Sequence, residues 1–134
     1  MDATRPEKAL EQLARESGRY PVEAFHFIRE ALQFTVDRLY GQEITEQRHV
    51  TGRDLCWGIR DYAIQCWGLM APSVLRRWNI ARTEDFGRLV FTMVEAGWMA
   101  KSDEDTPEDF ANIYDFRSAF ATPLKLEEKK MKMT

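Results

Sequence analysis

Residues 21–41, PVEAFHFIREALQFTVDRLYG, predict a long helix at the centre of the protein. Pro21 suits the first position of a helix, because its φ is already helical and its missing N–H would have no partner there. Gly41 is typical of the residue that follows a helix. Apolar residues form two stripes, one of Phe25, Ile28, Leu32, Val36 and Leu39 and a second of Phe27, Ala31 and Phe34. Because two apolar stripes need two sets of neighbours, we expect this helix to pack between others.

Start and stop signals predict four further helices, over about residues 6–18, 51–68, 72–78 and 83–97. Thr51 begins a sequence that resembles a capping box, with Asp54 in the place of the usual glutamate. Thr83 is a suitable N-cap, and Gly97 is a suitable residue to end a helix. The sequence therefore predicts a mainly α-helical protein, with a single compact domain of about five helices over residues 1–121.

The region after the fifth predicted helix allows two interpretations. The one we prefer is a small C-terminal β-hairpin, in which residues 98–100 pair with residues 110–116 across an acidic turn. The other places a second capped helix at residues 106–109, where Thr106 is followed by Pro107 and Asp109. Residues 122–134 contain four lysines, and we expect them to form a flexible, lysine-rich tail.

Length and composition exclude several classes of protein. The 134 residues are 44% hydrophobic and 31% charged, which is typical of one globular domain. No uncharged apolar run approaches the roughly 20 residues that span a bilayer, so we expect no membrane partner. The N-terminus is charged from its second residue and lacks the apolar region of a signal peptide, so we expect a cytoplasmic protein.

The order of the predicted elements is that of a winged helix-turn-helix, in which the third helix enters the major groove and a hairpin flanks it. The charges argue against a nucleic-acid partner, because the net charge is −3 and contacts to phosphates need cations. The turn that would form the wing carries only acidic charges, at Asp103, Glu104, Asp105, Glu108 and Asp109. A winged-helix-like regulator that binds nucleic acid is therefore the alternative hypothesis.

Few residues could carry chemistry: Cys56, Cys66, His26 and His49. The two cysteines lie in one predicted helix, about 15 Å apart along its axis, so they cannot form a disulfide there. The four residues also lack the close spacing of a zinc site. The sequence therefore predicts no metal, no cofactor and no catalytic residue. A small enzyme whose Cys/His site assembles only in the tertiary structure is the third hypothesis.

One side of the predicted helix 51–68 carries Arg53, Trp57, Arg60 and Ile64, opposite the main apolar stripe. Another helix of the same chain could cover this side. If it stays exposed, it is a candidate interface, because tryptophan and arginine contribute strongly to binding energy. The leading hypothesis is therefore a non-enzymatic protein-interaction module, which uses these four residues to bind a protein partner or a second copy of itself.

Four segments together resemble a known family: FHFIREAL (25–32), HVTGRDL (49–55), RTEDFG (82–87) and YDF (114–116). The sequence is similar to a family of short, uncharacterised bacterial proteins of the planctomycete and verrucomicrobial lineage. The resemblance covers most of residues 10–120 and implies a bacterial origin and a single compact domain. It implies no activity and no site residue.

Overall fold

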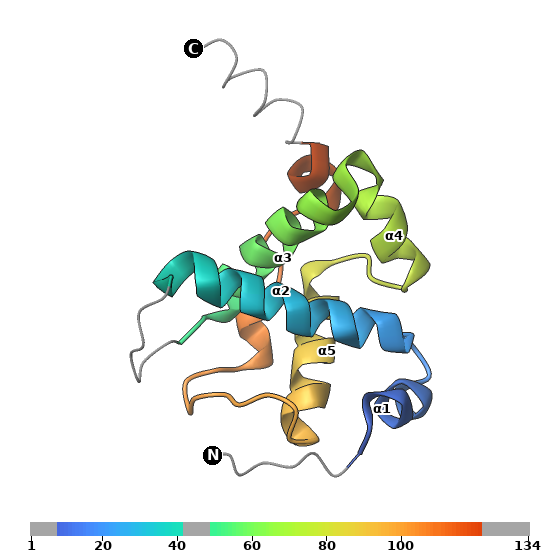
Figure 1. The fold of residues 1–134 in the computed structure, drawn as a ribbon, viewed down its shortest axis with the longest axis vertical. Coiled ribbons are helices and arrows are strands. Elements are labelled where there is room, and N and C mark those ends of the chain that lie inside the picture. The colour runs from blue at the N-terminus through green and yellow to red at the C-terminus, as the bar shows by residue number, and fades with distance from the viewer. Residues whose placement is uncertain (1–7, 42–48, 122–134) are drawn as a thin grey trace.

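The computed structural model of the protein describes residues 8–41 and 49–121. Its α-helices are α1 (Leu10–Ser17), α2 (Val22–Tyr40), α3 (Gly52–Trp67), α4 (Ala71–Arg77) and α5 (Thr83–Glu95), shown in Figure 1. Two short 3-10 helices, η1 (Gly68–Met70) and η2 (Pro107–Phe110), precede α4 and follow α5, and residues 116–121 are again helical. The described residues confirm the prediction of a mainly helical protein with about five helices. The predicted tail 122–134 lies outside them.

Helix α2 is central, as predicted, and packs against α1, α3 and α5 (Figure 1). Phe25 and Ile28 are completely buried, and Leu32 is half-buried. Leu39, the last residue of the predicted stripe, is 48% exposed, so it does not belong to the core. In Figure 1 the C-terminal end of α2 extends beyond the helix α5 that it crosses.

A glycine sets the close approach of α2 and α3. A Cβ atom at Gly58 would lie only 1.8 Å from Oγ1 of Thr35 and 2.8 Å from its Cβ. Thr35 is buried, and its hydroxyl donates a hydrogen bond of 2.7 Å to the carbonyl of Ala31 within α2. Because neither helix can yield easily at this contact, only glycine fits at position 58.

Helix α5 begins differently from the sequence prediction. Thr83 is not the N-cap; it is the first helical residue, and Arg82 occupies the cap position. The carboxylate of Asp85 does the capping instead, since its Oδ2 accepts hydrogen bonds from the N–H groups of Ala81 and Arg82, at 2.8 and 3.2 Å. Its Oδ1 accepts from the hydroxyl of Tyr20 at 2.5 Å, which ties the start of α2 to α5.

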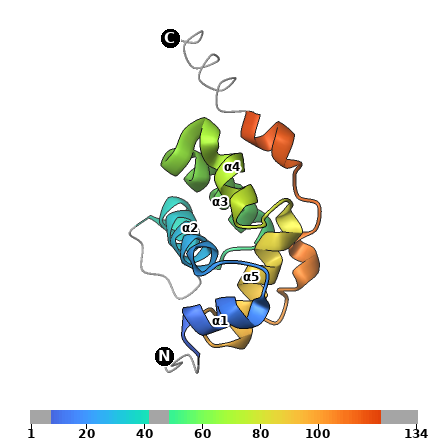
Figure 2. The same ribbon diagram turned by 90° about the vertical axis from the view of Figure 1, so that its right-hand side faces the viewer.

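The buried hydroxyl of Thr83 has a tertiary function. It donates to the carbonyl of Phe110 at 2.6 Å and accepts from the N–H of Ile113 at 3.1 Å. These hydrogen bonds hold residues 110–113 against the first turn of α5. Figure 2 shows the result, with residues 107–121 running along the side of α5 that faces away from α2.

The described residues contain no strand, so the preferred β-hairpin at residues 98–116 is absent from the structure. Residues 107–110 form η2, as in the alternative interpretation, and Asp109 accepts a hydrogen bond from the N–H of Thr106 at 3.0 Å. Trp98 packs against helices rather than a strand: its indole N–H donates to the carbonyl of Lys8, and the guanidinium of Arg29 lies 4.8 Å from its ring centre.

Buried Phe110 explains why η2 is preferred to a strand. A Cβ atom at Gly52 would lie 3.0 Å from the Phe110 ring, and one at Gly87 would lie equally close. The two glycines therefore let the ring settle against the backbones of α3 and α5. This burial stabilises η2 more than the pairing of two short strands would.

Candidate functional site

The side of α3 that carries Trp57 is partly covered by the chain's own C-terminal segment. The rings of Trp57 and Tyr114 lie 4.7 Å apart, and the hydroxyl of Tyr114 donates to the carbonyl of Cys56 at 2.7 Å. The guanidinium of Arg60 lies 5.1 Å from the Trp57 ring and donates to the carbonyl of Ala119 at 3.4 Å. Trp57 and Arg60 therefore already have partners within the chain, which weakens the prediction that they bind another protein.

The other two predicted interface residues differ from Trp57 and Arg60 in their surroundings. Arg53 is exposed in the first turn of α3. Ile64 is half-buried and packs against the core near the other end of the helix. No signal in the sequence identifies residues 114–119 as the cover, because their contacts with α3 are between residues nearly 60 positions apart.

The residues considered for catalysis do not form a site within the described ranges. Cys56 is buried, and burial raises the pKa of its thiol to about 12, so it stays protonated and weakly nucleophilic. Cys66 is exposed. Nε2 of His49 lies 3.2 Å from Oδ1 of Asp105, and His26 is exposed on α2. In this part of the chain no three His, Cys, Asp or Glu side chains could hold a metal ion.

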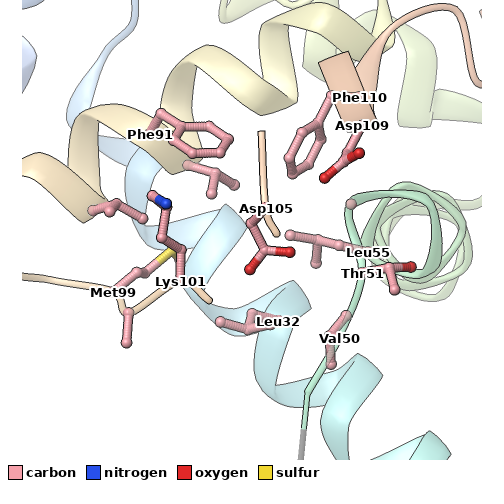
Figure 3. A pocket seen from close by; sticks show the side chains of 14 residues that line it. Leu32, Val50, Thr51, Leu55, Phe91, Met99, Lys101, Asp105, Asp109 and Phe110 are labelled. Atoms are coloured by element: carbon pink, nitrogen blue, oxygen red, sulfur yellow. The ribbon is translucent and has the colours of Figure 1, made fainter. Parts of the chain in front are cut away.

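A small pocket lies between α2, the start of α3, α5 and the segment before η2 (Figure 3). Leu32, Leu55 and Phe91 line it with apolar surface, and Asp105 points into it. Its volume is about 50 Å³, whereas pockets for metabolite-sized ligands hold roughly 300–1,000 Å³. Asp105 is moreover engaged by His49 and by the N–H of Ser102, at 2.9 Å. The pocket is therefore too small for a metabolite-sized ligand.

The most exposed apolar side chains among the described residues lie at the opposite end of α3. Leu69 is 59% exposed and Met70 is 62% exposed, and both belong to η1. Gly68 separates them from Trp67, whose ring meets the ring of Trp78 edge to face at 5.5 Å. Both tryptophans are half-buried. We call these four residues, Trp67, Leu69, Met70 and Trp78, the α4 patch.

The chain around the α4 patch differs in charge from the rest of the protein. Residues 62–83 contain no aspartate or glutamate, although the protein as a whole has a net charge of −3. The segment does contain Arg76, Arg77 and Arg82, which are all exposed. The segment that contains the α4 patch therefore combines exposed apolar residues with an excess of positive charge, and exposed apolar residues of this kind are typical of protein-binding surfaces.

Comparison with known proteins assigns no function to these features, since no family model, curated protein or solved structure matches the chain. The resemblance to the uncharacterised bacterial family stays a prediction. Within residues 8–41 and 49–121, no helix combines the length and the apolar character needed to cross a membrane.

Proposed function

We propose that the protein is a non-enzymatic protein-interaction module that binds a partner protein through the α4 patch. The observation that carries this proposal is the exposure of Leu69 and Met70 beside the Trp67–Trp78 pair. Leaving two large adjacent apolar side chains in water forgoes about 1.5–3 kcal/mol for each, which a partner would recover by covering them. Tryptophan and methionine are also enriched at protein interfaces.

The α4 patch is a different surface from the predicted one, which is the side of α3 that carries Trp57 and Arg60. Trp57 already has Tyr114 as a partner, and Arg60 is bound to Asp61 and to the carbonyl of Ala119. A protein partner at that side would have to displace or extend these contacts. Leu69 and Met70 face no such competitor in the described part of the chain, so the α4 patch is the better candidate.

The winged-helix alternative has less support. It would use α5 as the recognition helix, but α5 is packed against α2 and η2, and its buried residues include Phe86, Leu89 and Met93. Arg88, the one cation of α5, is paired with Asp85 at 2.8 Å. A helix in this position offers DNA few groups that could contact bases or phosphates.

A cytoplasmic location is part of the proposal. Cys66 is an exposed free thiol, and Cys56 is a buried one. Free thiols persist in reducing compartments, whereas oxidising compartments favour disulfides.

The proposal is tested by recovering partners with the full-length protein, with a Leu69→Glu/Met70→Glu variant and with a Leu39→Glu variant. Leu39 is a matched control, since it is also a leucine about half exposed, but on α2. We expect a defined partner that binds the wild type and the control equally and the double variant at least about tenfold more weakly. Equal binding of all three proteins by every recovered partner would contradict the proposal.

A further inference from the structure

A groove separates α4 and the residues that follow it from the helical residues 116–121. Its volume is about 460 Å³, which lies within the range of roughly 300–1,000 Å³ that ligand pockets occupy. Its accessible apolar lining comes from both walls, with half-buried Pro72 on one side and half-buried Phe116 on the other, while Ile80 and Phe120 lie beneath them and are buried. We call it the α4 groove.

Packing holds the second wall of the α4 groove in place. The rings of Phe116 and Phe120 lie 5.3 Å apart, and the ring of Phe116 stacks on buried Phe86 of α5 at 5.6 Å. The carboxylate of Asp115 accepts a hydrogen bond from the N–H of Ser118 at 3.1 Å and so caps the helical turn. The groove is therefore formed before any ligand arrives, which lowers the entropy lost on binding.

Two arginines line the α4 groove, Arg76 on the α4 side and Arg117 on the other. Among the described acidic residues, neither has an ion-pair partner. Glu84 and Asp115 line an adjoining hollow that shares Ala81 and Phe116 with the groove, and their carboxylates accept hydrogen bonds from the N–H groups of Asn112 and Ser118. Arginines without a partner on both walls of an apolar groove favour a ligand that brings its own carboxylates.

We infer that the α4 groove binds an acidic peptide segment of a partner protein. This inference rests on the proposed function and specifies the chemistry of the partner. An apolar side chain of the peptide enters between the half-buried Pro72 and Phe116, and flanking carboxylates accept hydrogen bonds from Arg76 and Arg117. The protein's own residues 122–134 do not match this ligand, because they contain four lysines and only two glutamates.

The observations favour a peptide over a nucleic acid. Single-stranded nucleic acids bind by stacking bases on exposed aromatic rings along a row of cations. In the α4 groove only Phe116 is partly exposed, since Phe120 is 3% exposed, so the groove lacks the row of aromatic rings on which successive bases would stack. Two arginines are also few beside the roughly six to ten phosphate contacts of a typical nucleic-acid site.

The experiment selects peptides from a random library displayed on phage, with the full-length protein as the target. We expect the enriched peptides to contain an aromatic or aliphatic residue flanked by aspartate or glutamate. A synthetic copy of one such peptide is then titrated into each variant and followed by fluorescence anisotropy. Arg76→Glu/Arg117→Glu should weaken binding at least about tenfold, because it replaces two attractions by two repulsions.

Arg53→Glu is the matched control, since Arg53 is also an exposed arginine, and it should change the affinity less than about twofold. The inference is wrong if no acidic peptide is enriched, or if the double variant binds as the wild type does. It is also wrong if a single-stranded oligonucleotide binds with the same dependence on Arg76 and Arg117. If binding of the peptide depends on Leu69 and Met70 alone, the proposed function survives and the α4 groove is not the site.

Discussion

The centre of the molecule and its α4 end use polar side chains in opposite ways. In the centre, Thr83 and Asp85 are buried, and both make several hydrogen bonds within the chain. At the α4 end, Arg76 and Arg77 are exposed and bind no described residue. Since a buried polar group must be satisfied internally, the first pair serves the fold. The second pair is available to a partner, and changes at the two ends should separate stability from binding.

The largest effect should come from Gly58→Ala in the centre. The added methyl group would overlap Thr35, so α2 and α3 must separate. We expect a loss of at least about 3 kcal/mol in the free energy of unfolding, measured by urea denaturation. Adding Thr35→Ala should recover part of this loss, because it removes the atom that lies 1.8 Å away. A fully stable single variant would show that the two helices are not in close contact.

Asp85→Asn should have the next largest effect, about 2.5 kcal/mol at neutral pH. Burial opposes ionisation of Asp85, but hydrogen bonds from Tyr20, Ala81 and Arg82 outweigh burial and lower the pKa of this carboxyl. A lowered pKa in the folded state gives stability that is complete above the ordinary aspartate pKa and is lost as the pH falls through the folded value.

The difference in unfolding free energy between wild type and Asp85→Asn should therefore be constant from about pH 7 to pH 5 and shrink below about pH 4. Urea denaturation of both proteins across this range measures it. A difference that does not change with pH would mean that the charge of Asp85 contributes nothing.

Trp57→Ala should lower the free energy of unfolding by about 2 kcal/mol, because it removes the ring contacts with Tyr114 and Arg60. The same variant should leave binding of the partner at the α4 patch unchanged. Thermal unfolding and a binding titration of one preparation test both expectations. Lost binding with full stability would return the interface to the side of α3 that the sequence indicated.

The smallest effect on stability should come from the α4 end. Arg77→Glu and Arg76→Glu should each change the free energy of unfolding by less than about 0.5 kcal/mol, because neither side chain is packed or paired in the described structure. Urea denaturation checks this as well. A large loss from either substitution would place these arginines among the groups that hold the fold.

Local signals in the sequence were enough to predict most of the helices. The hydroxyl oxygen of Thr51 accepts a hydrogen bond from the N–H of Asp54 at 3.0 Å, which confirms the predicted start of α3. Gly18 follows α1 with a φ of 61°, as expected of a residue that ends a helix. These features depend on neighbours within a few residues, so the sequence alone contains what they need.

Tertiary contacts decided the features that the sequence did not predict correctly. The cover over Trp57 depends on Tyr114, and the choice of η2 over a hairpin depends on Gly52 and Gly87 accepting the Phe110 ring. The α4 patch was missed for a related reason. Leu69 and Met70 lie between the predicted helices 51–68 and 72–78, and only the fold shows that no described element covers them.

Hydrogen–deuterium exchange, with and without a recovered partner, tests the proposed interaction surface most directly. Bound partner should slow exchange of backbone amides in η1 and α4, residues 68–77, and leave the already protected centre of α2 unchanged. Protection confined to the exposed first turn of α3, around Arg53, would contradict the account and place the interface on the side of α3 that Trp57 occupies.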